Sequence, residues 1–159
     1  MVEQVSRVDR PADAVWARAT TPAGIRHELR PLLSMTMPPG LRGLGVEDAV
    51  DRLDEPLGKA WLLLAGVLPV EYDDMRIVAL DPGRRFQERS TMLLLSRWEH
   101  ERLVTPLGHG ACEVRDRLMF VPRVLAGRPV VRRVAERLVA ALFAHRHRRL
   151  RAWASNGSN

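Results

Sequence analysis

The central part of the chain, residues 59–121, consists of apolar segments that follow one another with only turn signals between them. They cover 59–68, 75–80, 86–94, 97–104 and 112–121, and Pro, Gly and Asp residues separate them. No segment between them is long enough for a helix, so consecutive strands must pair as antiparallel neighbours. The sequence therefore predicts an antiparallel meander with one apolar face that needs a cover.

A single long helix over residues 129–153 is predicted to supply this cover. At about 100° per residue, one stripe of the helix is apolar and the far side is basic. The stripe holds Val131, Val134, Ala135, Leu138 and Leu142 and continues into His145, Arg146 and Arg149, whereas the far side holds Arg133, Arg137, His147, Arg148 and Arg151. We therefore expect Leu138 and Leu142 to be buried against Trp98, Leu118 and Phe120, with His147 and Arg148 in solvent.

The first third of the chain predicts a strand over residues 3–8 and short helices over 12–19 and 23–29. Residues 34–57 are rich in Pro and Gly and predict a strand edge and a long loop. The fold class is thus α+β: a curved antiparallel sheet of six to seven strands, two short helices after the first strand, and a long C-terminal helix over the sheet. One domain is expected over residues 1–154, followed by a polar tail at 155–159.

Cysteine content and hydropathy restrict the environment of the protein. Cys112 is the only cysteine, which excludes a disulfide within the chain and a multi-cysteine zinc site and suits a reducing cytoplasm. The sequence shows no secretory signal, and the longest apolar stretch, 61–70, is too short to span a bilayer. A cytoplasmic protein without membrane insertion is therefore expected.

The positive charge of the chain is concentrated in its C-terminal part. Residues 100–159 carry twelve basic and four acidic side chains, whereas residues 1–99 carry thirteen and fifteen. Such asymmetry is typical of a polyanion partner, but the use of 24 arginines and one lysine is also what GC-rich coding produces. Neither a helix-turn-helix nor an exposed aromatic platform is visible, so the sequence disfavours nucleic acid as a partner.

The order of predicted elements resembles the helix-grip fold of the START-like superfamily, also called SRPBCC, which includes the birch-pollen allergen and polyketide cyclases. The similarity extends over nearly the whole chain and is carried by four segments: RPADAVWARATTPAGI, ALDPGRRFQERS, WEHERLVTPLGHGACEVRDRLMFVP and FAHRHRRL. The last three are most similar to a bacterial subgroup of small, uncharacterised proteins of ligand-binding type. The resemblance implies a hydrophobic cavity between helix and sheet. Since the superfamily contains both carriers and enzymes, activity does not follow from the fold.

Strand alternation places several polar residues on the face that would meet the helix. The candidate cavity residues are Glu88, Ser90, Trp98, His100, Arg102, Asp116, Phe120 and Arg146. Two interpretations of the charged members remain open. Cationic groups could hold an anionic ligand end, or Asp116 could pair with Arg146 or Arg102 and fix the helix on the sheet. We favour the structural interpretation, because buried charges are more often paired than used on substrate, and expect Arg146 to pair with Asp116.

The function predicted from the sequence is the binding of a small apolar or amphipathic molecule, including one with an anionic end. The alternative is a polyketide cyclase or aromatase acting in the same cavity, with His100, Arg102, Asp116 and Glu88 as its proton-transfer groups. A third, weaker alternative is an interaction protein with a basic surface. No nucleophile motif, Gly-rich phosphate loop or metal-ligand spacing is present, so neither a cofactor nor a metal is expected.

Overall fold

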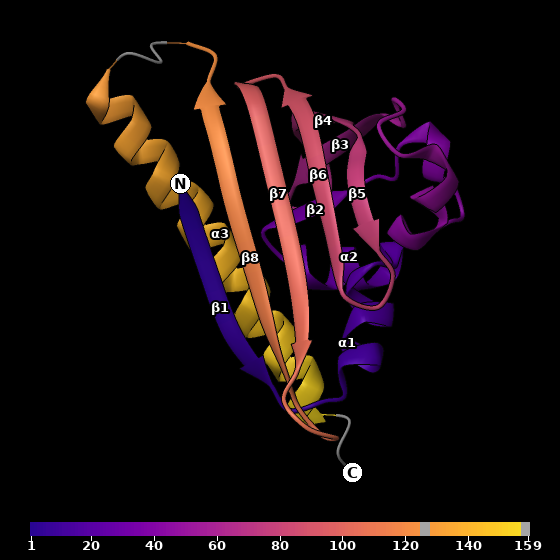
Figure 1. Cartoon of the computed structure of the whole chain (residues 1–159). Helices are drawn as coiled ribbons and strands as arrows, with labels where there is room; N and C mark the ends of the chain where they lie inside the picture. Colours follow the sequence, from indigo (N-terminus) through magenta and orange to yellow (C-terminus); the bar gives the residue numbers. More distant parts are fainter. Residues whose placement is uncertain (125–127, 157–159) are drawn as a thin grey trace.

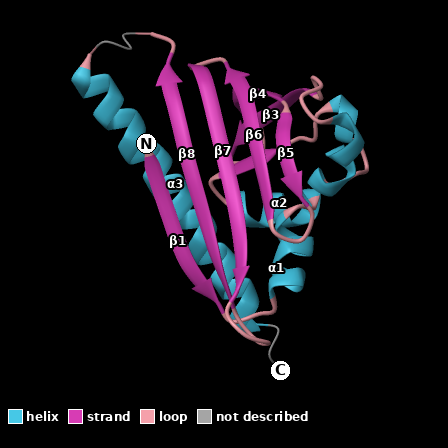
Figure 2. Cartoon of the chain, in the orientation of Figure 1, coloured by secondary structure: helices cyan, strands magenta, loops and turns pink. Residues whose placement is uncertain are grey.

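The computed structural model describes residues 1–124 and 128–156 and contains one curved antiparallel sheet crossed by a long helix (Figures 1 and 2). In chain order the elements are β1 (Val2–Val8), α1 (Ala12–Ala19), α2 (Pro22–Leu29), β2 (Leu33–Met35), η1 (Pro39–Leu41), η2 (Val46–Arg52), β3 (Gly58–Leu64), β4 (Leu68–Met75), β5 (Ile77–Asp81), β6 (Arg85–Met92), β7 (Leu95–Pro106), β8 (Cys112–Pro122) and α3 (Pro129–Asn156). The predicted α+β class is confirmed.

The sheet runs in the order β1-β8-β7-β6-β4-β3-β2, and β5 pairs with β6 beside β4. From β6 to β8 each strand pairs antiparallel with the next, as short connections require, and β1 closes the edge beside β8. The first strand is thus an edge strand that pairs with the last one, and it lies close to α3 (Figure 1). The sheet curves around the space that α3, α1 and α2 cover.

The short helices α1 and α2 meet at a tight corner, which places α2 against α3 and β2. Thr21 caps α2 by accepting a hydrogen bond from the Gly24 N–H at 3.2 Å, with Pro22 in the first turn. A side chain at Gly24 would lie 1.7 Å from the Arg18 carbonyl oxygen, so only glycine allows this approach. One turn further along α2, Glu28 is completely buried.

Within residues 1–124 and 128–156 the sheet has eight strands, where six to seven were expected. The segment 59–68 was predicted as one strand ending at Pro69, and this was wrong. Ala65 and Gly66 both have positive φ, 50° and 80°, and turn the chain so that β3 and β4 form a hairpin. Pro69 lies inside β4, at a point where the pairing with β3 shifts register, and there its missing N–H is tolerated.

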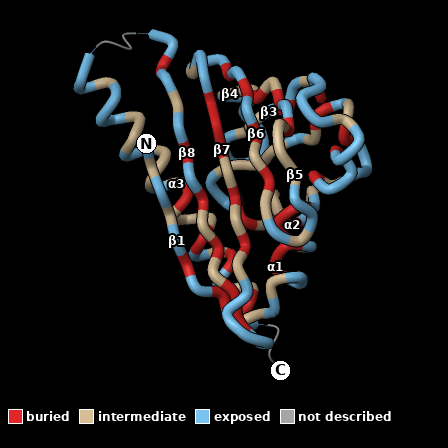
Figure 3. The backbone as a smooth tube through the Cα atoms, viewed as in Figure 1, coloured by how far each residue is buried: buried red, intermediate tan, exposed pale blue. Residues whose placement is uncertain are grey.

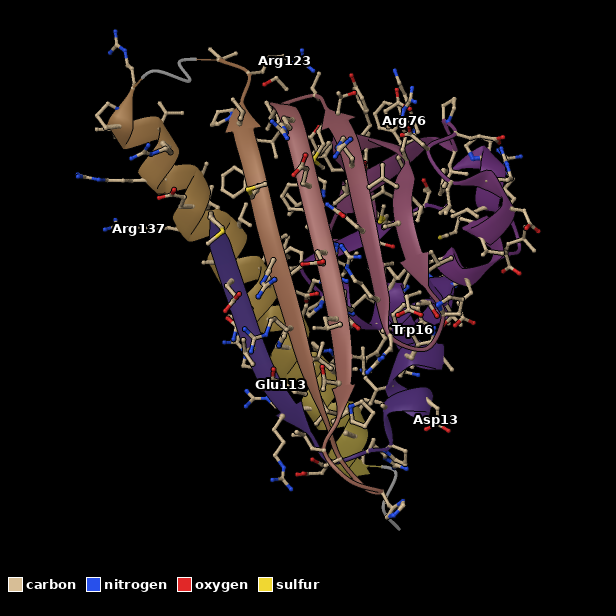
Figure 4. The ribbon with its side chains drawn as sticks, viewed as in Figure 1. Asp13, Trp16, Arg76, Glu113, Arg123 and Arg137 are labelled. Atoms are coloured by element: carbon tan, nitrogen blue, oxygen red, sulfur yellow. The ribbon has the colours of Figure 1, made fainter. Side chains whose placement is uncertain are left out.

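The rotation of α3 about its axis differs from the expectation. Its buried residues are Phe143, His147, Leu150 and Ala154, and not the stripe through Leu138, which is 67% exposed. The first half of the helix extends past β1 and β8, and its residues are mostly exposed (Figure 3). Arg137 points away from the strands, as predicted (Figure 4).

The buried core divides into two clusters on the inner face of the sheet. The larger one packs α1 and the last turns of α3 against the sheet, and the smaller one surrounds Trp98, Leu118 and Phe143. The helix continues through Asn156, two residues into the expected tail, and residues 157–159 lie outside the described part. No helix within the described ranges has the length and apolar character needed to cross a membrane.

Candidate functional site

A cavity of about 340 Å³ lies between α3, α2 and the inner face of the sheet. Most of its wall is aliphatic or aromatic: Ala19, Ile25, Leu29, Leu33, Met35, Val46, Leu62, Val70, Met75, Ile77, Phe86, Met92, Leu94, Leu95, Trp98, Leu138, Val139, Leu142 and Phe143. The polar part of the wall is formed by Glu71, Asp73, Glu88, His100 and Arg146. The space is therefore an apolar chamber with a few polar groups, which is the usual composition of a small-molecule site.

Next to the chamber, a buried charge network connects β7, β8 and α2. Arg102 donates from Nε and Nη2 to the two carboxylate oxygens of Asp116, at 2.8 and 2.7 Å. The same guanidinium donates from Nη1 and Nη2 to both oxygens of Glu28, at 2.9 and 3.0 Å. All three side chains are completely buried. Because Arg102 is held by two carboxylates, it has the paired state that a buried charge requires.

The pairing determines the ionisation of this network. Burial alone would raise the pKa of Asp116, but Arg102 and His100 outweigh this effect and hold the pKa well below its ordinary value. Burial would likewise raise the pKa of Glu28, and Arg102 together with Arg146 lowers it. Burial would lower the pKa of the Arg102 guanidinium, but the carboxylates of Asp116 and Glu28 outweigh this effect and raise it. The three groups are therefore charged at neutral pH.

Two histidines also contact Asp116. The Nε2 of His100 lies 3.0 Å from Oδ1, and the Nε2 of His147 lies 2.9 Å from Oδ2. His147 is 1% exposed, so the prediction that it faces solvent was wrong. Arg146 was predicted to pair with Asp116, and this was also wrong, because its Nε and Nη2 donate to Glu28 at 3.1 and 3.0 Å. A rotation of α3 by about one residue, about 100°, accounts for both differences.

On the other side of His100, a second polar group reaches the cavity. The Nδ1 of His100 lies 3.8 Å from the Glu88 carboxylate, and the Ser90 hydroxyl donates to Glu88 at 2.8 Å. Asp73, from β4, lies beside the Glu88 carboxyl. Burial would raise the pKa of Glu88, but His100, Asp73 and Ser90 lower it. Burial and the neighbouring Glu88 charge both raise the pKa of Asp73, well above its ordinary value.

Four of the eight predicted cavity residues line the chamber: Glu88, Trp98, His100 and Arg146. The other four, Ser90, Arg102, Asp116 and Phe120, are not part of its wall. Arg102 and Asp116 lie in the buried network, and Ser90 supports Glu88. Depth within the fold thus separates the residues that line the chamber from Arg102 and Asp116, which lie in the buried network.

Three functional candidates were missed from the sequence: Glu28, Asp73 and His147. Glu28 lies on a short helix with little amphipathic pattern, and His147 was assigned to the wrong side of α3. Asp73 precedes a segment recognised as a strand, and its alternation with Glu71 and Met75 could have revealed that it faces inward. In the described part of the chain, no three His, Cys, Asp or Glu side chains are grouped as a metal site.

Comparison with solved structures identifies the fold. The chain is similar to the Zhui aromatase/cyclase from Streptomyces sp. R1128, with a TM-score of 0.71 and 19% identity over 99% of this chain and 94% of that one. It is also similar to a START superfamily protein from Mycobacterium smegmatis, with a TM-score of 0.69 and 10% identity over 99% and 98%. Protein CV1439 from Chromobacterium violaceum gives a TM-score of 0.68 and 14% identity over 95% and 94%. At these identities the similarity establishes the START-like, helix-grip fold that the sequence predicted.

Sequence comparison assigns the family. No curated protein matches the chain. The model of the family described as "Domain of unknown function (DUF8410)" matches residues 6–154, from the end of β1 through β8 and nearly all of α3. The chain therefore belongs to the DUF8410 family, and its fold is START-like.

Proposed function

We propose that the protein binds a small, mainly apolar molecule in the chamber between α3 and the sheet. The observation that carries this proposal is the composition of the wall: aliphatic and aromatic side chains from eight or more elements surround about 340 Å³ of space, with the polar groups gathered on β4, β6, β7 and α3. An unfilled apolar space of this size costs packing energy. A function in ligand binding explains why the fold maintains a cavity that its own side chains do not fill.

The volume limits the size of the ligand. Small-molecule sites usually measure roughly 300–1,000 Å³, so this chamber is near the lower end. At roughly 30 Å³ for each water-sized group, it accommodates on the order of ten to fifteen non-hydrogen atoms. A molecule with one or two rings fits these dimensions, and the aromatic side chains of Phe86, Trp98 and Phe143 provide faces on which it would pack.

A second candidate function is an enzyme of the cyclase or aromatase type in the same chamber. The observation in its favour is the group formed by Asp73, Glu88 and His100, in which one carboxyl has a raised pKa and its neighbour a lowered one. Two titratable groups with pKa values pushed apart can act as an acid and a base. The similarity to an aromatase/cyclase supports this candidate only at the level of the fold.

Probe binding with a blocked chamber tests the proposal. The fluorescent two-ring probe 2-naphthol is expected to bind the folded protein, and Val139→Trp, which fills the wall of the chamber from α3, is expected to abolish binding. Val134→Trp is the matched control, because Val134 lies on the same helix but is half exposed and outside the wall. Equal binding by both variants would contradict a site in the chamber. Native mass spectrometry of protein from its source would then identify a retained ligand and, for an enzyme, its product.

A further inference from the structure

The Asp73 carboxyl lies on the chamber wall with one of its oxygens unsatisfied. Asp73 is 4% exposed, and no N–H or O–H among the described residues satisfies its buried Oδ1. Its neighbour on the wall is the carboxyl of Glu88, itself 7% exposed. Two neighbouring buried carboxylates repel each other, and burial penalises the charge of each. Burial and the Glu88 charge therefore favour the form of Asp73 that keeps its proton.

The surrounding charges explain why this proton is held. Glu28 and Asp116 are compensated by Arg102 and Arg146, which donate to them directly. Glu88 faces His100, which also contacts Asp116. No positively charged side chain of the described part pairs with Asp73, and its near charged neighbours are Glu88 and Asp74. In the ligand-free protein, the proton on Asp73 neutralises a buried carboxyl that has no cationic partner.

The other polar groups of the wall are already engaged. Arg146 donates to Glu28 and stacks on the Phe143 ring, with its guanidinium carbon 4.7 Å from the ring centroid. Glu71 accepts hydrogen bonds from the backbone N–H groups of Leu93 and Leu94. Among the described residues of the wall, the Asp73 oxygen beside Glu88 is thus the polar atom that still lacks a partner, and it is acidic.

We propose that Asp73 and Glu88 form a recognition site for a protonated amine carried by an aromatic or other apolar ligand. The ligand enters as an ammonium ion, its N–H groups donate to the Asp73 and Glu88 oxygens, and the proton of Asp73 leaves to solvent. The apolar body packs in the remainder of the chamber, where aromatic faces of Phe86, Trp98 and Phe143 also attract a cation. This inference rests on the proposed binding function, and it selects an amine over an anionic ligand end.

Three probes with the same ring system separate the alternatives: naphthylethylamine, naphthylethanol and naphthylacetic acid. We expect the wild-type protein to bind the amine at least about tenfold more tightly than the alcohol, because a charge-assisted hydrogen bond in a buried site is stronger than a neutral one. Isothermal titration in buffers of different ionisation enthalpy should show proton release on amine binding, because Asp73 ionises, and no release with the alcohol.

Asp73→Asn is the decisive variant. The asparagine amide can still donate to Glu88, so the fold is kept, but the wall loses the charge that an ammonium ion needs. Amine affinity should fall about tenfold and proton release should disappear, while alcohol affinity changes by less than about twofold. Asp74→Asn is the matched control: Asp74 is adjacent in β4 but outside the chamber wall, and this variant should bind like the wild type. Circular dichroism verifies folding.

The outcomes separate this inference from the proposed function. If amine and alcohol bind equally, if the acid binds most tightly, or if Asp73→Asn leaves amine binding intact, the amine site is refuted while ligand binding in the chamber stands. If none of the probes binds to the folded protein, the chamber is not a site for molecules of this size, and both proposals fall.

Discussion

His147 on α3 and Asp116 on β8 meet in the core, with the imidazole Nε2 2.9 Å from the carboxylate Oδ2. Both side chains are buried, at 1% and 0% exposure. This contact sets the rotation of the long helix relative to the sheet, because a buried carboxylate needs its donors and can obtain this one only if position 147 faces inward. Arg146 then points towards α2 and pairs with Glu28.

Asp116→Ala is expected to cost about 3–5 kcal/mol of the free energy of unfolding, because Arg102 and His147 would lose a shared buried acceptor. Arg148→Ala serves as the control and should be nearly neutral, since Arg148 is exposed. Urea denaturation measures both. A double-mutant cycle between Asp116 and His147 should give a coupling energy of about 0.5–3 kcal/mol. Additive effects would mean that the contact does not stabilise the fold.

Two leucines on α3 test which side of the helix is buried. Leu150 is 1% exposed, and Leu150→Ala should cost about 2–5 kcal/mol through lost burial and a cavity. Leu138 is 67% exposed, so Leu138→Ala should change stability by no more than about 0.5 kcal/mol. The same denaturation measurements check both values. The reverse ranking would support the helix rotation expected from the sequence.

The protein should become less stable relative to its Asp73→Asn variant as the pH rises. Burial and the facing Glu88 carboxyl, with a smaller contribution from Asp74, raise the pKa of Asp73 well above its ordinary value. Above about pH 4 the unfolded chain releases a proton that the folded protein retains, and the stability difference widens until the pH passes the raised pKa. Unfolding free energies of both proteins at intervals from pH 4 to pH 8 measure the difference. A constant difference would contradict a protonated Asp73.

Below about pH 4, the stability of the protein should decrease as the pH falls. The pKa values of Asp116 and Glu28 are lowered in the folded protein, since their cationic partners outweigh the effect of burial. Their contribution to stability is present above the unfolded pKa, about 4, and is lost as the pH falls below it. Glu28→Gln should therefore flatten the loss of stability below pH 4, as followed by circular dichroism. A profile as steep as that of the wild type would show that Glu28 does not drive acid unfolding.

Cys112 should be unreactive in the folded protein. Its side chain is completely buried, and burial raises the pKa of the thiol to about 11. Since the thiolate is the reactive form, iodoacetamide at pH 8 should leave the native protein unmodified and label it rapidly in urea. Intact mass spectrometry distinguishes the two states. Rapid labelling without denaturant would mean that β8 opens readily at this edge.

Much of the fold was determined by the sequence itself. Turn residues between apolar segments set the positions of β6, β7 and β8, and the helix over residues 12–19 was predicted with the bounds that α1 has. These features depend on local preferences and on alternation, which a sequence displays directly. The exception was the hairpin between β3 and β4, because its turn at Ala65 and Gly66 is embedded in an uninterrupted apolar stretch.

The tertiary structure alone decided how α3 is rotated and which acidic groups meet. In residues 129–153, two adjacent stripes of the helix contain a similar mixture of apolar and basic side chains, so the sequence does not show which stripe is buried. The structure decides this through two contacts, His147 with Asp116 and Arg146 with Glu28. Asp73 and Glu88 come from β4 and β6, strands that touch over a short register, so no local pattern predicts their contact. A buried charge is stable only when an oppositely charged group lies beside it. Since these groups are far apart in the sequence, only the folded chain shows which of them pair.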